Sequence, residues 1–194
     1  MTSREHLLAP LTAAALIGQQ VAANAIRDAL FLTWFPITSL PYFMAAAAVL
    51  AIVAAEMSGR LLASFGPARV VPVILVVHSV LFLAEWDLLG LHPQVASAVL
   101  YVHASVLGAI GISAFWSMLN ERFDPHAAKP LMARVAAAAA FGGLAGGVGA
   151  ERITVLLSQG ALFALLGLSG GACVAGCVVL GHGMPARRDR KSVV

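Results

Sequence analysis

One stretch decides the fold: QVAANAIRDALFLTWF, residues Gln20 to Phe35, which places Arg27 and Asp28 inside a run otherwise apolar enough to cross a bilayer. Ionisable side chains at membrane depth are costly and usually face the interior of a helix bundle or a water-filled path. On a helix, four polar residues share roughly one face: Gln20, Asn24, Arg27 and Asp28. We therefore expect a transmembrane helix with one polar face, covered by the rest of the chain.

The composition is that of a membrane protein. Of the 194 residues, 60% are hydrophobic and 11% are charged, with a mean hydropathy of +0.91, whereas soluble domains carry about 25% charged residues. Apolar segments near the ~20 residues needed to span a bilayer follow one another at 7–35, 42–64, 71–89, 95–120, 131–150 and 153–180. We predict an all-α, polytopic membrane protein whose six helices form one domain, 1–188, in a lipid bilayer.

The basic residues indicate the topology. They gather at the N-terminus, in the second and fourth connections and in the tail: Arg4, Arg69, Arg122, Lys129, Arg187 and Arg188. The other connections hold mainly Arg152, so the positive-inside rule predicts that both termini are cytoplasmic. We attribute the positive net charge to topology and expect no nucleic-acid partner. Abundant alanine, with ten arginines to two lysines, indicates a GC-rich, bacterial genome and hence the cytoplasmic (inner) membrane.

Ionisable pairs occur in the second and third spans. Glu56 and Arg60 are four residues apart, which fits a local ion pair or a coupling site. His78 and Glu85 are seven apart and share one helix face, so His78 is either a packed, hydrogen-bonded histidine or part of a proton relay. These four residues are candidates for coupling or gating.

A second polar stripe is expected on the fourth span. It consists of His103, Ser113, Ser117 and Asn120. Serine and asparagine also join helices through hydrogen bonds, and this alternative stays open. With the polar face of the first span, His103, Ser117 and Asn120 are candidates for a translocation pathway.

Small residues dominate the fifth span. Ala138, Gly142, Gly146 and Ala150 recur every four residues, a spacing that lets helix backbones approach closely and favours the bundle interior.

The last span indicates no enzyme. Gly167-Leu168-Ser169-Gly170 resembles the Gly-x-Ser-Gly of rhomboid proteases, but His182 lies 13 residues further along the helix, about 20 Å away. Cys173 and Cys177 lie in an apolar run without further ligands, which favours small packing residues. We assign no catalytic residue, metal or cofactor.

The connection after the second span resembles a loop of the major facilitator superfamily, whose pattern is Gly-x-Leu-x-Asp-Arg-x-Gly-x-x-basic. Gly59, Leu61, Gly66 and Arg69 match, whereas Ala63-Ser64 replaces the acidic and basic centre. Six spans with an inside N-terminus are also what one half of such a transporter contains, including its nested three-helix repeats.

Three further motifs resemble the ATP/ADP translocase family of nucleotide transporters. They are Ile26-Arg27-Asp28, Phe115-Trp116 with Asn120, and Ala128-Lys129. The family has a lysine after Arg-Asp that helps to hold phosphates, and this chain has Ala29-Leu30-Phe31 there. We therefore expect a divergent member in which Arg27 is the candidate anion-binding group.

The resemblance implies the N-terminal half of a secondary transporter that works by alternating access with a second six-helix half. The solute would be a small molecule, anionic or nucleotide-like. A direct Arg27–Asp28 pair is poor geometry for adjacent helical residues, so we expect their partners among Glu85, His78 and His103. The alternative is a membrane scaffold or sensor that keeps the fold without transport.

The last six residues, 189–194, match a translated sequencing adaptor. We interpret them as a non-native tail that replaces the rest of a longer protein. An ordinary basic cytoplasmic tail is the alternative.

Overall fold

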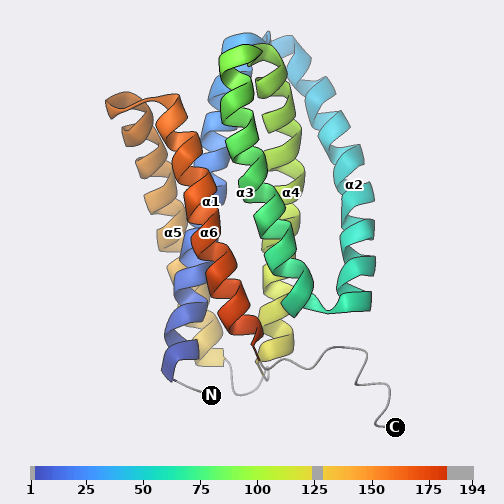
Figure 1. Cartoon of the computed structure of the whole chain (residues 1–194), viewed down its shortest axis with the longest axis vertical. Coiled ribbons are helices and arrows are strands. Elements are labelled where there is room, and N and C mark those ends of the chain that lie inside the picture. Colours follow the sequence, from blue (N-terminus) through green and yellow to red (C-terminus); the bar gives the residue numbers. More distant parts are fainter. Residues whose placement is uncertain (1–2, 124–128, 183–194) are drawn as a thin grey trace.

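The computed structural model describes residues 3–123 and 129–182, which form a helical bundle (Figure 1). No strand occurs within these ranges, so the all-α prediction is confirmed. The tail at 189–194 and Ala128 of the Ala128-Lys129 motif lie outside the described residues. The elements are α1 (Ser3–Trp34), a short 3₁₀ turn η1 (Ile37–Ser39), α2 (Leu40–Phe65), α3 (Pro67–Leu91), α4 (Pro93–Arg122), α5 (Lys129–Leu156) and α6 (Gln159–Gly181).

Five of these helices, α2 to α6, are long and apolar enough to cross a membrane. The sixth, α1, has 32 residues and carries the Arg27–Asp28 pair. It packs against α4, α5 and α6 in the same bundle, and its polar face includes the part-buried Arg27 and the exposed Asp28. The predicted membrane character is thus supported by the length and composition of the helices.

The boundary between the last two helices differs from the prediction. The charged pair Glu151-Arg152 was expected to form a turn, but α5 continues through it to Leu156, with both side chains exposed. The break comes at Ser158, whose Oγ accepts a hydrogen bond from the backbone N of Ala161 at 3.0 Å and caps α6. The charges lie on a solvated helix end, and the capping serine starts the next helix.

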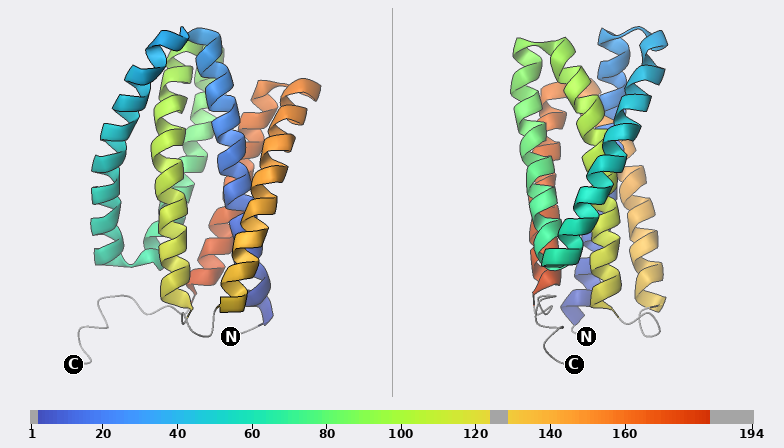
Figure 2. Two further views of the ribbon diagram at one scale, coloured as in Figure 1. Left: turned by 180° about the vertical axis from the view of Figure 1, so that it is seen from behind. Right: turned by 90° about the vertical axis from the view of Figure 1, so that its right-hand side faces the viewer.

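The helices alternate in direction, and the described ends of the chain lie at the same end of the bundle (Figures 1 and 2). The turn between α2 and α3 is made by Gly66, whose φ of 80° is a conformation that other residues rarely adopt. This accounts for one of the glycines of the expected connection.

The helix contacts follow a pattern that repeats between the first three and the last three helices. Two kinds of contact occur twice: α1 packs on α5 and α4 packs on α2, while α3 packs on α4 and α6 packs on α1. Two further contacts, α1 with α4 and α3 with α6, each join the helices that correspond to one another in this pattern. Exchanging α1 with α4, α2 with α5 and α3 with α6 therefore maps these contacts onto one another. The exchanged helices run in opposite directions (Figure 2), a pattern that two three-helix units in inverted orientation would produce. The match concerns which helices touch and not how extensively, because α1 packs far more closely on α5 than α4 does on α2.

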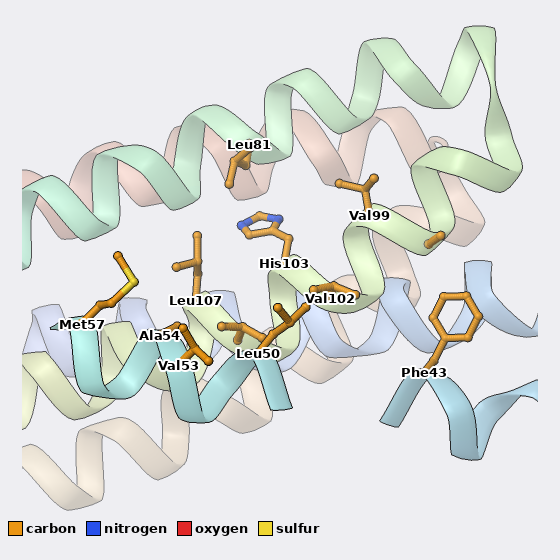
Figure 3. A pocket seen from close by; sticks show the side chains of 12 residues that line it. Phe43, Leu50, Val53, Ala54, Met57, Leu81, Val99, Val102, His103 and Leu107 are labelled. Atoms are coloured by element: carbon orange, nitrogen blue, oxygen red, sulfur yellow. The ribbon is translucent and has the colours of Figure 1, made fainter. Parts of the chain in front are cut away.

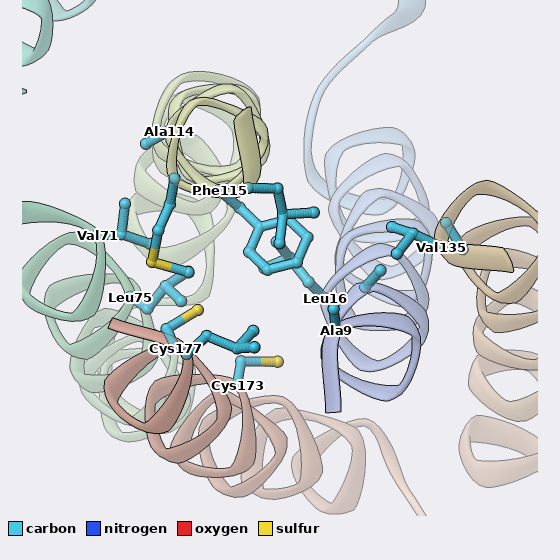
Figure 4. Close-up of a cluster of buried hydrophobic side chains, with 14 of the residues drawn as sticks. Ala9, Leu16, Val71, Leu75, Ala114, Phe115, Val135, Cys173 and Cys177 are labelled. Atoms are coloured by element: carbon cyan, nitrogen blue, oxygen red, sulfur yellow. The ribbon is translucent and has the colours of Figure 1, made fainter. Parts of the chain in front are cut away.

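The core is divided along the bundle axis. Towards the described ends of the chain, side chains from five helices converge around Phe115, Cys173 and Cys177 (Figure 4). A second cluster, which includes Phe82 and Phe163, lies towards the other end. Both cysteines are fully buried free thiols, as the sequence indicated.

Candidate functional site

The polar face of α1 meets α4 at Gln20. The carboxamide Nε2 of Gln20 donates to Asn24 Oδ1 at 3.2 Å and to the backbone oxygen of Ala104 at 3.0 Å. Gly108 of α4 leaves the room for this carboxamide, since a Cβ there would overlap it. The predicted face is therefore the seam between α1 and α4, and a helix backbone satisfies part of it.

Further along this seam, Arg27 binds groups from both helices. Its Nη2 and Nε lie 2.7 and 2.8 Å from Oδ1 of Asp28, and its Nη1 donates to Ser105 Oγ at 3.0 Å. The guanidinium also lies 5.0 Å from the ring centroid of Tyr101, in cation–π geometry. The Ser105 hydroxyl in turn donates to the backbone oxygen of Tyr101 at 2.6 Å.

These contacts correct one expectation. A direct Arg27–Asp28 pair was considered poor geometry, yet the two side chains are bonded. The long arginine side chain spans the 100° between adjacent helical positions, and its fork directs two N–H groups to one carboxylate oxygen. Partners among Glu85, His78 and His103 were expected instead, and that expectation is wrong because those three residues bind one another.

A buried chain of ionisable groups joins α3 to α4. Nδ1 of His103 lies 2.8 Å from Oε1 of Glu85, and Nε2 of His103 lies 2.7 Å from Nδ1 of His78. All three residues are at most 6% exposed. The ring of Phe82 packs on both imidazoles, with centroids 4.7 Å from His78 and 4.9 Å from His103.

The shared face of His78 and Glu85 was predicted from their spacing, and His103 completes the chain from the neighbouring helix. With Glu85 ionised, one proton per hydrogen bond requires that Nδ1 of His103 donates to the carboxylate and that Nδ1 of His78 donates to Nε2 of His103. Within the described residues, Glu85 Oε2 and Ser97 Oγ are buried without a hydrogen-bond partner. The chain is therefore satisfied internally but has one unpartnered carboxylate oxygen.

The expected second stripe on α4 divides into two. His103 is buried against α3, whereas Ser113, Ser117 and Asn120 are exposed. Ser117 Oγ donates to the backbone oxygen of Ser113 at 3.1 Å, and both line a hollow of about 350 Å³ between α2 and α4. These residues thus belong to a different surface from the histidine.

The other candidate pair is a local one. Arg60 Nε lies 2.9 Å from Glu56 Oε1, and both side chains are largely exposed on α2. The i, i+4 ion pair that the spacing predicted is present, without a contact to the α1/α4 seam or to the buried chain.

A larger cleft of about 620 Å³ opens between α2 and the α3/α4 pair (Figure 3). Its lining is apolar except for His103, whose ring forms part of the wall. The remaining lining residues are Phe43, Leu50, Val53, Ala54, Met57, Leu81, Ala98, Val99, Val102, Val106 and Leu107. Apolar side chains therefore surround the middle member of the buried chain on the α2 side.

The residues that sequence reasoning missed are mostly partners of those it found. Tyr101 and Ser105 are four apart on α4 and form the site of Arg27, and this i, i+4 polar pair was the available signal. Gln19 Nε2 donates to the backbone oxygen of Leu166 at 2.7 Å, which joins α1 to α6. Comparison of the chain with protein-family models, with curated proteins and with solved structures finds no match.

Proposed function

We propose that this bundle is the N-terminal half of a secondary active transporter, working by alternating access on a small anionic solute, nucleotide-like ones included. The observation that carries the proposal is Arg27. Its side chain is 18% exposed at the α1/α4 seam, where Asp28, 55% exposed, balances its charge. Ionisable residues within membrane spans are uncommon and usually mark solute or ion pathways, so the charge of Arg27 is the property to explain.

The repeated contact pattern supports the proposal. In transporters built from inverted repeats, the solute site lies where the repeats meet. Here the α1·α4 pair relates the two three-helix units, and Arg27 contacts α4 at Tyr101 and Ser105. The arginine therefore lies at the junction of the two units.

The anion preference follows from the guanidinium. Arginine presents a planar fork of N–H donors that matches carboxylate and phosphate groups. Asp28 holds that fork through a single oxygen, Oδ1. A solute anion would compete with this adjacent carboxylate, and its binding would open the Arg27–Asp28 pair.

Two helices leave faces for a second bundle. Ala47 is the one buried residue of α2, and α5 packs almost entirely on α1. Helices α2 and α5 correspond to one another in the contact pattern, so each three-helix unit leaves its corresponding helix largely uncovered. Such faces suit a missing C-terminal six-helix half, against which the bundle would rock.

Membrane orientation is part of the proposal. Arg69, Arg122 and Lys129 lie at the connections on the same end of the bundle as the N-terminal helix start, and Arg152 lies towards the other end. The positive-inside rule places the first end in the cytoplasm. We assign the chain to a bacterial cytoplasmic membrane, with N- and C-termini inside.

One observation favours the alternative, a membrane scaffold or sensor without transport. The bonds from Arg27 to Asp28 and Ser105 satisfy the arginine within the bundle, as a structural ion pair would. Uptake and stability separate the two functions, because an anion site needs the charge and a scaffold needs only the fold.

The test uses proteoliposomes that contain the product of the complete gene. Uptake of labelled phosphate, sulfate and adenine nucleotides is measured for wild type, Arg27→Ala and Arg134→Ala, the last an exposed arginine of α5. We expect Arg27→Ala to abolish uptake with normal membrane insertion and Arg134→Ala to transport like wild type. Undiminished uptake by Arg27→Ala would refute the solute site; no uptake by wild type, with Arg27→Ala merely less stable, would favour the scaffold.

A further inference from the structure

The Glu85, His103 and His78 side chains form an uninterrupted hydrogen-bonded chain that the Arg27 site does not use. Its two bonds are 2.8 and 2.7 Å long, and they cross from α3 to α4 and back to α3. Structural histidines need one or two partners of any polar kind, such as backbone oxygens. A carboxylate and two imidazoles joined end to end instead provide a continuous path for a proton.

We propose that Glu85, His103 and His78 form a proton-binding relay, and that the proton is the coupling ion of the transporter. The coupling of the proton to transport rests on the proposed function. Proton binding by the relay rests only on the geometry of the three side chains.

The transfer balances in protons and charge. A proton that binds Nε2 of His78 releases the proton on Nδ1 to Nε2 of His103. The proton on Nδ1 of His103 then passes to Oε1 of Glu85. The added proton ends on the carboxylate, and both imidazoles are neutral again with their tautomers inverted.

The relay has a direction along the membrane normal. Glu85 lies six residues before Leu91, the end of α3, and His78 lies 13 residues before it, so they are about 9 Å and about 20 Å from that end at 1.5 Å per residue. A proton would therefore move about 10 Å, from the middle of the bundle to a point still about 9 Å from the end opposite the N-terminus.

The outer end of the relay carries the second observation. Glu85 Oε2 and Ser97 Oγ are both buried and, among the described residues, both lack a hydrogen-bond partner. Glu85 lies six residues before the end of α3, and Ser97 lies four residues after the start of α4. The two residues are therefore at similar depth on the two arms of the α3/α4 hairpin. The unpartnered oxygen of Glu85 leaves a free acceptor position at this end of the relay, where the carboxylate can take up a proton without breaking its bond to His103.

The surrounding charges leave the relay isolated. On α1, Arg27 and Asp28 bond each other; on α2, Glu56 and Arg60 pair on the exposed face; and α6 carries no Asp, Glu, Lys, Arg or His from Gln159 to Gly181. On the relay's own helices, Asp87 and the turn residue His92 are exposed, and Tyr101 contacts Arg27. On the α2 side, the described residues that line the apolar cleft include no charged side chain, and the ring of His103 forms part of its wall (Figure 3).

The first test follows protonation directly, in the 194-residue chain reconstituted in lipid nanodiscs. Infrared difference spectra across a pH titration report the carbonyl stretch of a carboxyl that gains its proton. We expect a buried-carboxyl band that Glu85→Gln removes and that Asp87→Asn, the matched exposed acid on α3, retains. The amide keeps the oxygen that His103 binds, so the variant preserves the fold; a band unchanged by Glu85→Gln would overturn the proposal.

Nitrogen NMR of the histidine rings tests the relay without a variant. We expect a through-hydrogen-bond coupling between Nδ1 of His78 and Nε2 of His103, and one transition shared by both rings. His92→Gln identifies the signals of that exposed ring and should leave the coupling between His78 and His103 unchanged. Two rings that titrate independently, with no coupling, would overturn the relay.

Uptake separates this inference from the proposed function. The complete gene product is placed in proteoliposomes with the membrane potential clamped. An imposed pH gradient should then drive uptake, and Glu85→Gln should reduce the rate of this uptake at least tenfold. Uptake that ignores the gradient would overturn proton coupling and leave transport intact. A relay that titrates in a protein without uptake would retain the proton site and overturn the transporter.

Discussion

The backbone of Gly146 in α5 lies directly against the carbonyl oxygen of Gly18 in α1, so that a Cβ at residue 146 would overlap that oxygen. One turn earlier, Gly142 lies in the same way against Ala14. The four-residue spacing of small residues on α5 thus serves one purpose, the contact with α1. Without it, the helix that carries Arg27 would have no neighbour on this side.

Gly146→Ala should therefore destabilise the bundle. Accommodating the new Cβ requires a backbone shift, which costs about 1–3 kcal/mol in a well-packed site. Gly149→Ala is the matched control on the same helix, because nothing lies within 4 Å of its Cβ position; it should be neutral or stabilise the helix by up to about 1 kcal/mol. Unfolding in mixed detergent micelles measures both, and equal stability of the two variants would contradict close packing of α1 on α5.

Much of the fold was predictable because apolar length and small-residue spacing are local properties. The six helices, the i, i+4 pair of Glu56 and Arg60 and the common face of His78 and Glu85 all follow from spacing within one helix. The α5/α6 boundary was not predictable in this way. Glu151 and Arg152 would indicate a turn if the helix had to end where the apolar layer ends. Helix α5 instead continues through this pair to Leu156, so both charges can lie on the helix itself.

The site was harder to predict, because its contacts depend on helix rotation. The spacing of His103, Ser113 and Ser117 places them on roughly one face of the helix. In the bundle, His103 binds His78 of α3, whereas both serines remain exposed. Likewise, the Arg27–Asp28 pair depends on how a long side chain folds back, which spacing does not specify. Partners within one helix can be inferred from sequence; partners across helices need the packed bundle.

Gly108→Ala should weaken the α1/α4 seam. The new methyl group would occupy the position of the Gln20 carboxamide, which would then lose its bond to the Ala104 oxygen. A lost hydrogen bond costs about 0.5–1.5 kcal/mol. Gly111→Ala, on the same helix, meets only Leu75 at an ordinary 3.4 Å and should not destabilise; thermal unfolding of the pair provides the measurement, and a more damaging Gly111→Ala would refute this assignment of Gln20.

Tyr101 should act through its ring. Its ring lies under the Arg27 guanidinium and packs on Phe31 and Phe43, with centroids 4.9 and 5.6 Å away. Tyr101→Phe keeps these contacts and should unfold like wild type. Tyr101→Leu loses the cation–π contact and the aromatic pairs, about 1–3 kcal/mol together. If Tyr101→Phe were as unstable as Tyr101→Leu in denaturant titrations, the hydroxyl would be the group that matters.

The two native cysteines should resist modification in the folded protein. Both are 0% exposed in the core that α6 shares with α1, α3 and α4. A hydrophilic maleimide should leave them unlabelled in mild detergent and should label both after denaturation, as mass spectrometry would show. Rapid labelling of the folded chain would mean that the core around Phe115 opens on the time scale of the reaction.

Single cysteines at the two ends of the bundle test the membrane orientation, since the native thiols are buried and should stay silent. Ser64→Cys lies beside the α2/α3 turn near Arg69, and Leu91→Cys lies at the α3/α4 turn at the opposite end, both at exposed positions. If the positive-inside rule holds, a membrane-impermeant maleimide added to spheroplasts should label Leu91→Cys at once and Ser64→Cys only after lysis. The reverse pattern would invert the topology, and with it the side of the membrane from which Glu85 takes up or releases its proton.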